Sequence, residues 1–173
     1  MSFTIQQITE PISESQLDEL SETLIEAVAG GGSISFMHPV STDLAESFWR
    51  GISAGVARGE RALLVAVDDA DRIVGTVQVV LSQPENQPHR ADVAKLMVHP
   101  RARRQGIAEA LVREIETVAK AAGKSVLTLD TETGATAERL YKRLGWTVSG
   151  TIPDYALLPH GGLCSTTIFY KAI

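Results

Sequence analysis

The sequence lacks the features that mark several large classes of protein. Its 173 residues contain a single cysteine, Cys164, so no disulfide framework exists and we expect a reducing compartment. No apolar run approaches the length that spans a bilayer. The first residues have neither the basic region nor the apolar core of a secretory signal. We therefore expect a cytoplasmic protein that does not bind membranes.

The chain also lacks an excess of positive charge and any metal-ligand spacing. Its 16 Lys and Arg and 21 Asp and Glu give a net charge of −5, whereas nucleic-acid surfaces are basic, so we expect no nucleic-acid partner. His38, His89, His99 and His160 show no spacing typical of a metal site. The length and the ordinary share of apolar residues, 44%, predict one globular domain over residues 1–173.

One basic turn contrasts with this acidic background. Residues 96–98 (LMV) form a short apolar run, and Pro100 ends it because proline has no N–H for a strand ladder. The turn 101–105 (RARRQ) follows, and then Gly106. Apolar residues recur at helical spacing over 107–118. The pattern predicts a strand, a basic turn and a helix.

A helix that begins in such a turn is suited to an anion. Its first backbone N–H groups have no partner inside the helix, and its start carries positive dipole character. Gly106 lets the backbone approach a ligand, and Ala108 is small enough to do the same one turn later. The stretch has neither a Walker loop nor a dinucleotide fingerprint. A pyrophosphate is the anion we expect here.

The rest of the chain alternates between segments with the periodicity of strands and segments with the periodicity of helices. Strands are predicted at 3–8, 61–67, 72–82, 91–98, 125–130 and 164–171, with another starting at 146–149. Helices are predicted from Ser13 or Ser15 to Val28, and over 42–58, 104–122 and 134–144. Residues 83–90 and 150–163 read as loops, the second because it holds two prolines and three glycines. This order predicts an α/β (mixed α+β) fold with a mostly antiparallel sheet of about seven strands and helices on both faces.

Two segments resemble the signatures of GNAT-type N-acetyltransferases. Residues 103–108 (RRQGIA) match the acyl-CoA motif [RQ]-x-x-G-x-[GA]. Residues 137–146 (AERLYKRLGW) match A-x-x-x-Y-x-x-x-G-[FW]. Within that family, 30–37 (GGGSISFM), 129–132 (LDTE) and 166–171 (TTIFYK) are most similar to tabtoxin-resistance-like acetyltransferases, which implies a role in antibiotic or toxin resistance.

The resemblance implies acetyl-CoA as cosubstrate, no metal, and a central strand pair that splays to admit the cofactor. It implies direct transfer, in a ternary complex, to the primary amine of an amino acid or an amino-acid-like toxin. The residues expected to bind the cofactor are Leu96, Met97, Val98, Arg103, Arg104, Gln105, Gly106, Ile107 and Ala108.

The same resemblance suggests catalytic residues, each with a plainer alternative. Tyr141 stands where the family often places its general acid, but it shares a helix face with apolar residues and could simply pack. Asp92 is the favoured base, and Asp130 is expected to bind the substrate ammonium beside Glu132. The alternatives are an exposed strand start for Asp92 and a turn role for Asp130. Phe36, in the glycine-rich loop 30–39, is predicted either to contact substrate or to pack in the core.

Two other functions compete with small-molecule acetylation. The first is acetylation of a protein N-terminus or lysine, which an open groove would favour over a deep, closed site. The second is a non-catalytic acyl-CoA-binding module. The sequence leaves the acceptor open, because acceptor loops vary independently of the fold. It is equally compatible with a monomer and a homodimer.

Overall fold

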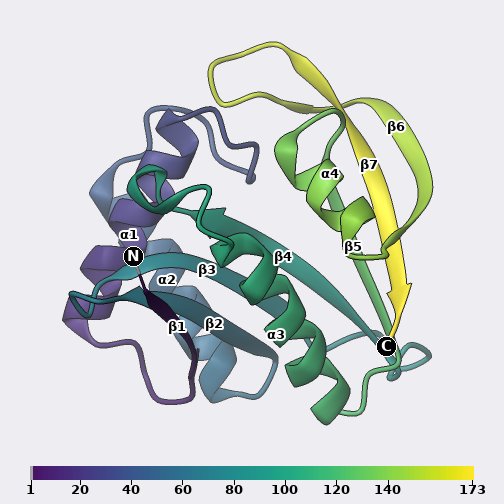
Figure 1. Cartoon of the computed structure of the whole chain (residues 1–173), viewed down its shortest axis with the longest axis horizontal. Helices are drawn as coiled ribbons and strands as arrows, with labels where there is room; N and C mark the ends of the chain where they lie inside the picture. Colours follow the sequence, from purple (N-terminus) through teal and green to yellow (C-terminus); the bar gives the residue numbers. More distant parts are fainter. Residues whose placement is uncertain (1) are drawn as a thin grey trace.

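A mixed β-sheet forms the centre of the molecule (Figure 1). The computed structural model describes residues 2–173, and over that range seven strands are ordered β1-β2-β3-β4-β5-β7-β6. The strands are β1 (Phe3–Ile8), β2 (Arg61–Asp68), β3 (Ile73–Val80), β4 (Arg90–Val98), β5 (Val126–Glu132), β6 (Thr147–Leu157) and β7 (Leu163–Ala172). The helices are α1 (Glu14–Ala29), α2 (Thr42–Ala57), α3 (Ile107–Ala121) and α4 (Thr136–Arg143), with a short 3-10 turn η1 (Pro100–Ala102).

The strand pairing confirms the predicted mixed fold. Strands β1 to β4 form an antiparallel meander. Strand β5 then pairs in parallel with β4, after the crossover through α3. Strand β7 lies antiparallel between β5 and β6. A parallel pair needs a connection that crosses over the sheet, and α3 supplies it between β4 and β5.

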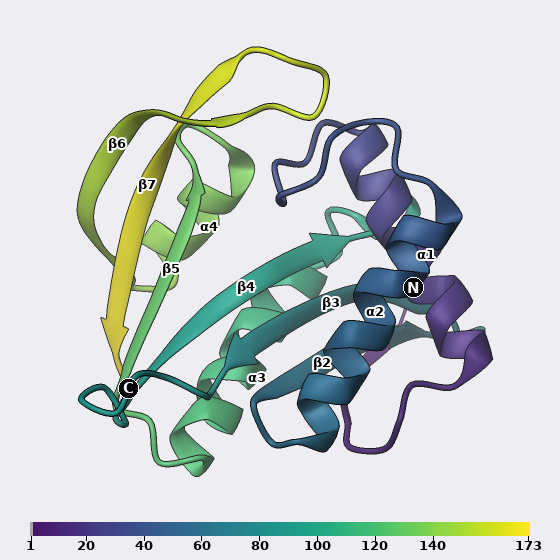
Figure 2. The same ribbon diagram turned by 180° about the vertical axis from the view of Figure 1, so that it is seen from behind.

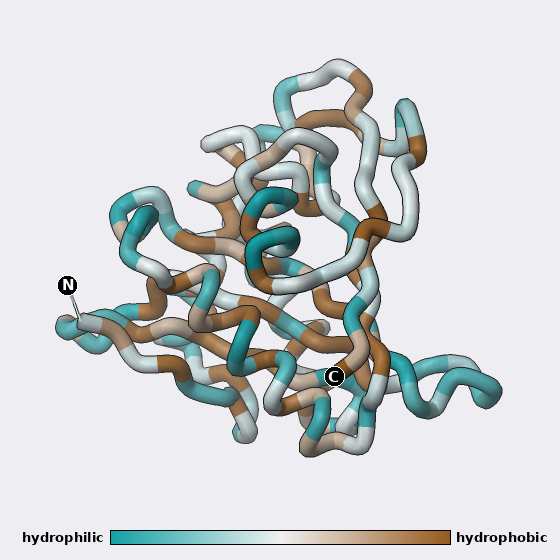
Figure 3. The backbone as a smooth tube through the Cα atoms, turned by 45° about the vertical axis from the view of Figure 1, so that its right-hand side comes forward, coloured by the Kyte–Doolittle hydropathy of each residue, from teal (hydrophilic) through white to brown (hydrophobic). Residues whose placement is uncertain are grey.

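Helices cover both faces of the sheet, as Figures 1 and 2 show from opposite sides. Helices α1 and α2 bury Leu20 and Trp49 in one apolar cluster. Helices α3 and α4 contribute Leu111 and Leu140 to a second cluster, which also contains Phe169. In Figure 3 hydrophobic segments run through the middle of the tube, and hydrophilic ones lie mainly on outer loops and helix turns. Burial of these apolar residues is the main stabilising contribution to the fold.

Side-chain caps fix the starts of the two N-terminal helices. Ser13, one of the two predicted caps, accepts a hydrogen bond from the Gln16 backbone, and the Gln16 side chain accepts one from the Ser13 N–H. This reciprocal pair is a capping box. Ser41 caps α2 by accepting from the Leu44 N–H. Two orphan N–H groups of α1 and one of α2 are satisfied in this way.

The predicted loop over 150–163 is wrong. Strand β6 continues to Leu157, and only residues 158–162 connect it to β7. Pro153 and Gly150 are tolerated because β6 is an edge strand whose register against β7 shifts beside both residues. An edge strand can lose an N–H at proline without losing a ladder bond.

The predicted helix over 104–122 also begins too early. Helix α3 starts at Ile107, because Arg104 and Gly106 have φ values of 63° and 82°, in the left-handed region. A helix cannot pass through two such residues. The basic segment is therefore an irregular turn between η1 and α3. This geometry leaves the helix start open to a ligand.

Candidate active site

Strands β4 and β5 separate in the middle of the sheet. They pair only at Arg90 with Val126, Ala91 with Leu127, and Asp92 with Thr128. Beyond that point the edge of β4 that faces β5 has no strand partner among residues 2–173, although β4 stays paired with β3 as far as Val98. Figure 1 and Figure 2 show the two strands diverging. The predicted splay of the central pair is confirmed.

A cavity of about 750 Å³ lies between the two halves of the sheet. Its walls come from the loop after α1, the second half of β4, the turn before α3 with the start of that helix, the end of β5, and α4. Leu96, Met97 and Val98 all line it. The free edge of β4 can therefore hydrogen-bond an extended ligand as an added strand would.

The start of α3 supplies an anion site at this cavity. Gly106 is its N-cap and has no side chain that could occupy the first N–H groups. Those N–H groups belong to Ile107, Ala108 and Glu109, all of which line the cavity. An ideal Cβ at Gly106 would meet no described atom within 4 Å, so open space lies in front of the backbone. A pyrophosphate fits this arrangement.

Arginines flank the anion site. Arg103 and Arg104 line the cavity, and Arg103 is held by a hydrogen bond of 3.4 Å from its Nε to the Val98 carbonyl. Gln105, which was predicted to bind the cofactor, is not among the cavity-lining residues. Its Oε1 is buried without a hydrogen-bond partner in the described part of the chain.

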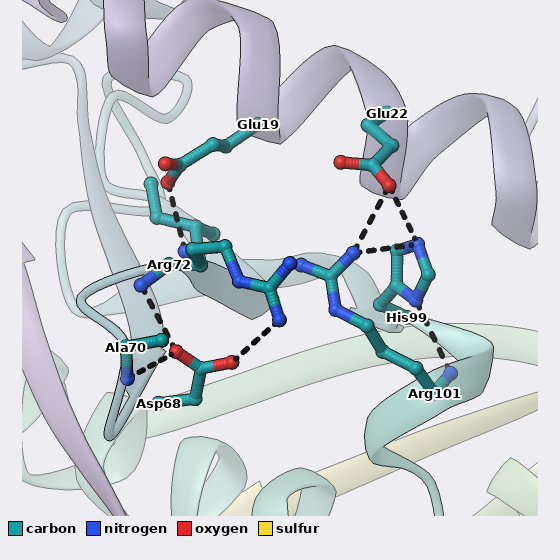
Figure 4. Close-up of polar contacts among 8 residues, drawn as sticks. Glu19, Glu22, Asp68, Ala70, Arg72, His99 and Arg101 are labelled. Carbon is teal, nitrogen blue, oxygen red and sulfur yellow. Dashed lines mark hydrogen bonds and ion pairs between the residues drawn. The ribbon is translucent and has the colours of Figure 1, made fainter.

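A polar cluster fastens the turn before α3 to α1 (Figure 4). The backbone N–H of Arg101 donates to His99 Nδ1 at 3.2 Å, so the neutral ring carries its proton on Nε2. That nitrogen lies 3.3 Å from Glu22 of α1, which also pairs with the Arg101 guanidinium at 3.0 Å. Burial first, and then the charge of Arg101, lower the pKa of His99 below its usual value despite Glu22 and Glu26. The cluster holds a neutral histidine next to the anion site.

Tyr141 both packs in the core and faces the cavity. It is 5% exposed, and its ring lies edge-on to Trp146 at 5.6 Å and 5.8 Å from Phe169. It is also a cavity-lining residue. Burial, with a further contribution from the charge of Asp130, raises the pKa of its phenol. At neutral pH Tyr141 is therefore protonated.

The predicted carboxylates have different surroundings. Asp130 and Glu132 line the cavity from the end of β5, and Asp130 accepts a hydrogen bond of 3.0 Å from the Thr166 hydroxyl. Asp92 lies where β4 and β5 are still paired and is not a cavity-lining residue. Its carboxylate is engaged by Arg90, by Thr128, and by Gln83 at 3.0 Å. The structure thus brings Tyr141 and Asp130 together but leaves Asp92 apart.

The glycine-rich loop contributes residues other than the predicted one. Phe36 packs edge-on against Phe48 at 5.2 Å in the α1–α2 cluster and does not line the cavity. Ile34 and Ser35 line it instead. Sequence reasoning also passed over Lys95, which lines the cavity from β4. Its place directly before the apolar run 96–98, which leads into the basic turn, was a signal. The direction of its side chain depends on a left-handed φ of 57°, which the sequence does not predict.

Comparison with known proteins agrees with this geometry. The model of the Acetyltransferase (GNAT) family matches residues 28–146, which include both the turn before α3 and Tyr141. The chain belongs to the GNAT acetyltransferase family. An uncharacterized N-acetyltransferase in the hisH-hisA intergenic region of Azospirillum brasilense is 31% identical over 129 residues, covering 73% of this chain and 74% of that protein.

Solved structures share the GNAT fold. One is yncA from Salmonella typhimurium with its cofactor acetyl-CoA, at a TM-score of 0.79 and 18% identity, covering 99% of this chain and 94% of that one. Another is a ribosomal-protein-alanine N-acetyltransferase from Brucella melitensis, at a TM-score of 0.80 and 21% identity. The match covers 98% of this chain and 99% of that one. At these identities the likeness shows the fold alone.

The protein is thus an acetyl-CoA-dependent acetyltransferase of the GNAT type. The described chain, residues 2–173, contains no cluster of His, Cys, Asp and Glu that could hold a metal ion. Across the same residues, no helix is long and apolar enough to cross a membrane.

Proposed function

We propose that the protein transfers the acetyl group of acetyl-CoA to the primary amine of a small molecule, an amino acid or an amino-acid-like toxin. A bound acetyl-CoA supplies an activated thioester: the amine nitrogen forms a bond to its carbonyl carbon while the carbon–sulfur bond to CoA breaks. The chain's own residues must hold the cofactor, orient the amine and move two protons.

The observation that carries the proposal is a contact between two loops, one of which, the loop after α1, lines the cavity through residues 30–35. The loop after α1 meets the β6–β7 connection, where the His38 N–H donates to the Pro159 carbonyl at 2.9 Å. The His160 ring lies 3.0 Å from the Ala29 carbonyl and its centroid is 4.7 Å from that of His38. A bridged rim of this kind favours a small acceptor over a folded protein surface.

Different residues at the cavity bind the cofactor and the amine. Arg103, Arg104 and the first N–H groups of α3 hold the pyrophosphate, and the free edge of β4 holds the pantetheine arm. Asp130 receives the amine, because its carboxylate lies at the cavity and Thr166 fixes its orientation. We assign the proton-accepting role to Asp130 rather than to Asp92.

The second proton comes from Tyr141. The departing CoA sulfur needs a proton, and the Tyr141 phenol lines the cavity and is protonated at neutral pH. Asp130, whose charge contributes to this raised pKa, acts on the same region of the cavity. One carboxylate to accept a proton and one phenol to donate one complete the transfer.

A panel of acceptors tests the function. Purified protein is incubated with acetyl-CoA and with free amino acids, simple amines and lysine- or N-terminal peptides, and thiol release is followed. We expect turnover with small amines and a fall of about 100-fold in Tyr141→Phe. Turnover with peptides alone would replace the proposal with protein acetylation. Tight acetyl-CoA binding without thiol release from any acceptor would favour a binding module.

A further inference from the structure

Lys95 of β4 lies at an irregularity that turns its side chain toward the cavity. Between the pairs Ala94–Gln78 and Met97–Thr76, β4 has one more residue than β3. Lys95 is within this insertion and has a φ of 57°. Such a bulge bends the strand and redirects a side chain. The bulge therefore accounts for a lysine on a cavity wall in the middle of the sheet.

The ammonium of Lys95 is incompletely used by the protein. Lys95 Nζ donates to the Ser35 hydroxyl at 2.8 Å, on the loop that walls the cavity. An ammonium has three N–H donors, and within residues 2–173 this is its one hydrogen bond. Burial lowers the pKa of Lys95 because the charged form loses hydration, and the charge of Asp130 opposes that effect. The charges of Lys95 and Asp130 thus influence each other, yet no ion pair joins them among residues 2–173.

We propose that Lys95 is a specificity-determining residue that binds a carboxylate of the acceptor, while Asp130 receives the acceptor's amine. The acceptor is then a zwitterion, with a carboxylate and a primary amine on one small molecule. This inference rests on the proposed acetyl transfer and adds the group that selects the substrate class.

A carboxylate fits Lys95 better than a phosphate of the cofactor does. The anion site for the pyrophosphate is at the start of α3 and is flanked by its own arginines. Lys95 instead has Ser35 and the negative charge of Asp130 as neighbours, and Asp130 would repel a phosphate dianion more than a monoanionic carboxylate. A charge-assisted hydrogen bond from a half-buried ammonium is one of the stronger polar contacts available.

The test compares each amino acid with its own carboxamide as acceptor. The two have the same shape near the amine, but the carboxamide lacks the negative charge. Steady-state kinetics are measured for the wild type and for Lys95→Gln, Lys95→Arg and Lys120→Gln. Lys120 is an exposed lysine of α3 that does not line the cavity, so its variant controls for loss of a surface charge.

We expect Lys95→Gln to raise the KM for amino acids tenfold or more and to leave that for the carboxamides within about twofold. Lys95→Arg should recover part of the preference, and Lys120→Gln should behave as the wild type. Equal losses for both acceptor types would show that Lys95 merely supports the wall. A weaker KM for acetyl-CoA in Lys95→Gln would place Lys95 in the cofactor site. Either result overturns the proposal.

Calorimetry separates this inference from the proposed function. If the wild type acetylates no amine, the proposed function fails, but binding of N-acetyl amino acids and their amides to the CoA-loaded protein can still be measured. A carboxylate preference present in the wild type and absent in Lys95→Gln would sustain the role of Lys95. The absence of any such preference in the wild type would remove it.

Discussion

The Thr166 hydroxyl of β7 donates a hydrogen bond of 3.0 Å to the Asp130 carboxylate of β5. Thr166 is 4% exposed, and its single hydroxyl hydrogen is shared with the Thr131 carbonyl, also at 3.0 Å, so this buried hydroxyl helps to orient an exposed acid on the next strand. Removing it in Thr166→Val should raise the KM for the amine several-fold through misplacement of Asp130. Steady-state kinetics check this, and Thr166→Ser, which keeps the hydroxyl, should stay near the wild type. An unchanged KM in Thr166→Val would mean that β5 alone positions Asp130.

Exchange of each carboxylate for an amide distinguishes Asp130 from Asp92. Asp130→Asn should lower kcat/KM by about 100-fold, in the range of lost general-base catalysis. Asp92→Asn should keep most of the activity and lower the free energy of unfolding by about 1 kcal/mol, because it weakens contacts to Arg90 and Thr128 that hold β4 to β5. Kinetics and urea unfolding of both variants provide the measurements. The reverse pattern would restore Asp92 as the base.

Tyr141→Phe should separate packing from catalysis. The ring contacts with Trp146 and Phe169 remain in the variant, so the melting temperature should change little. Turnover should fall by about 100-fold, the low end of the range for a lost acid, since water can replace part of the function. Acetyl-CoA affinity serves as the internal control and should not change. Wild-type turnover, measured where chemistry is rate-limiting, would reduce Tyr141 to a packing residue.

Two glycines in the same conformation provide a matched test of the anion site. Gly106 and Gly123 have φ values of 82° and 80°, and neither has a described atom within 4 Å of an ideal Cβ. Valine at either position costs about 1–2 kcal/mol of stability from the left-handed backbone. Only Gly106→Val should also weaken acetyl-CoA binding, by more than tenfold, because its side chain would occupy the space in front of the helix start. Calorimetry on both folded variants decides the point.

His99 should make stability depend on pH. Its pKa is lowered by burial and by Arg101 more than Glu22 and Glu26 raise it, so the unfolded chain takes up a proton at higher pH than the folded protein does. The contribution of His99 to the free energy of unfolding is fully present above the ordinary histidine pKa, near 6.5. It is lost as the pH falls toward the lower pKa that His99 has in the folded protein. Protonation also removes the acceptor for the Arg101 N–H. In urea unfolding at pH 7.5 and 5.5, His99→Asn should lose less stability on acidification than the wild type does.

The elements with strong local patterns could be predicted from the sequence. A helix start at Ser13 or Ser15 and a strand over 3–8 were predicted, and the structure has its cap at Ser13 and its strand at Phe3–Ile8, because both follow from neighbouring residues. The full length of strand β6 could not be predicted, because Pro153 is typical of a strand end. Pro153 is tolerated here because β6 lies at the edge of the sheet. The start of α3 was misplaced because the φ of Arg104 is set by the fold around the turn.

The cofactor side of the site was more predictable than the acceptor side. The turn from Arg103 to Ala108 is contiguous in sequence, so its chemistry could be read directly. The proposed acceptor side is assembled from the cavity-lining residues Ser35, Lys95 and Asp130, which lie on three separate segments. Whether Asp92 or Asp130 lies at the cavity depends on the residue at which β4 and β5 separate. The sequence of one strand alone does not specify which residues of the other strand it pairs with.

In the proposed binding mode, the separation of β4 from β5 makes acetyl-CoA a structural component as well as a reactant. With three residue pairs joining the two halves of the sheet, a ligand lying along the free edge of β4 substitutes for missing interstrand bonds. Binding to the folded chain alone adds stability that grows with the logarithm of ligand concentration. The enzyme's resistance to proteolysis should then follow the acetyl-CoA supply, so that a cell poor in this metabolite would also clear the enzyme that consumes it.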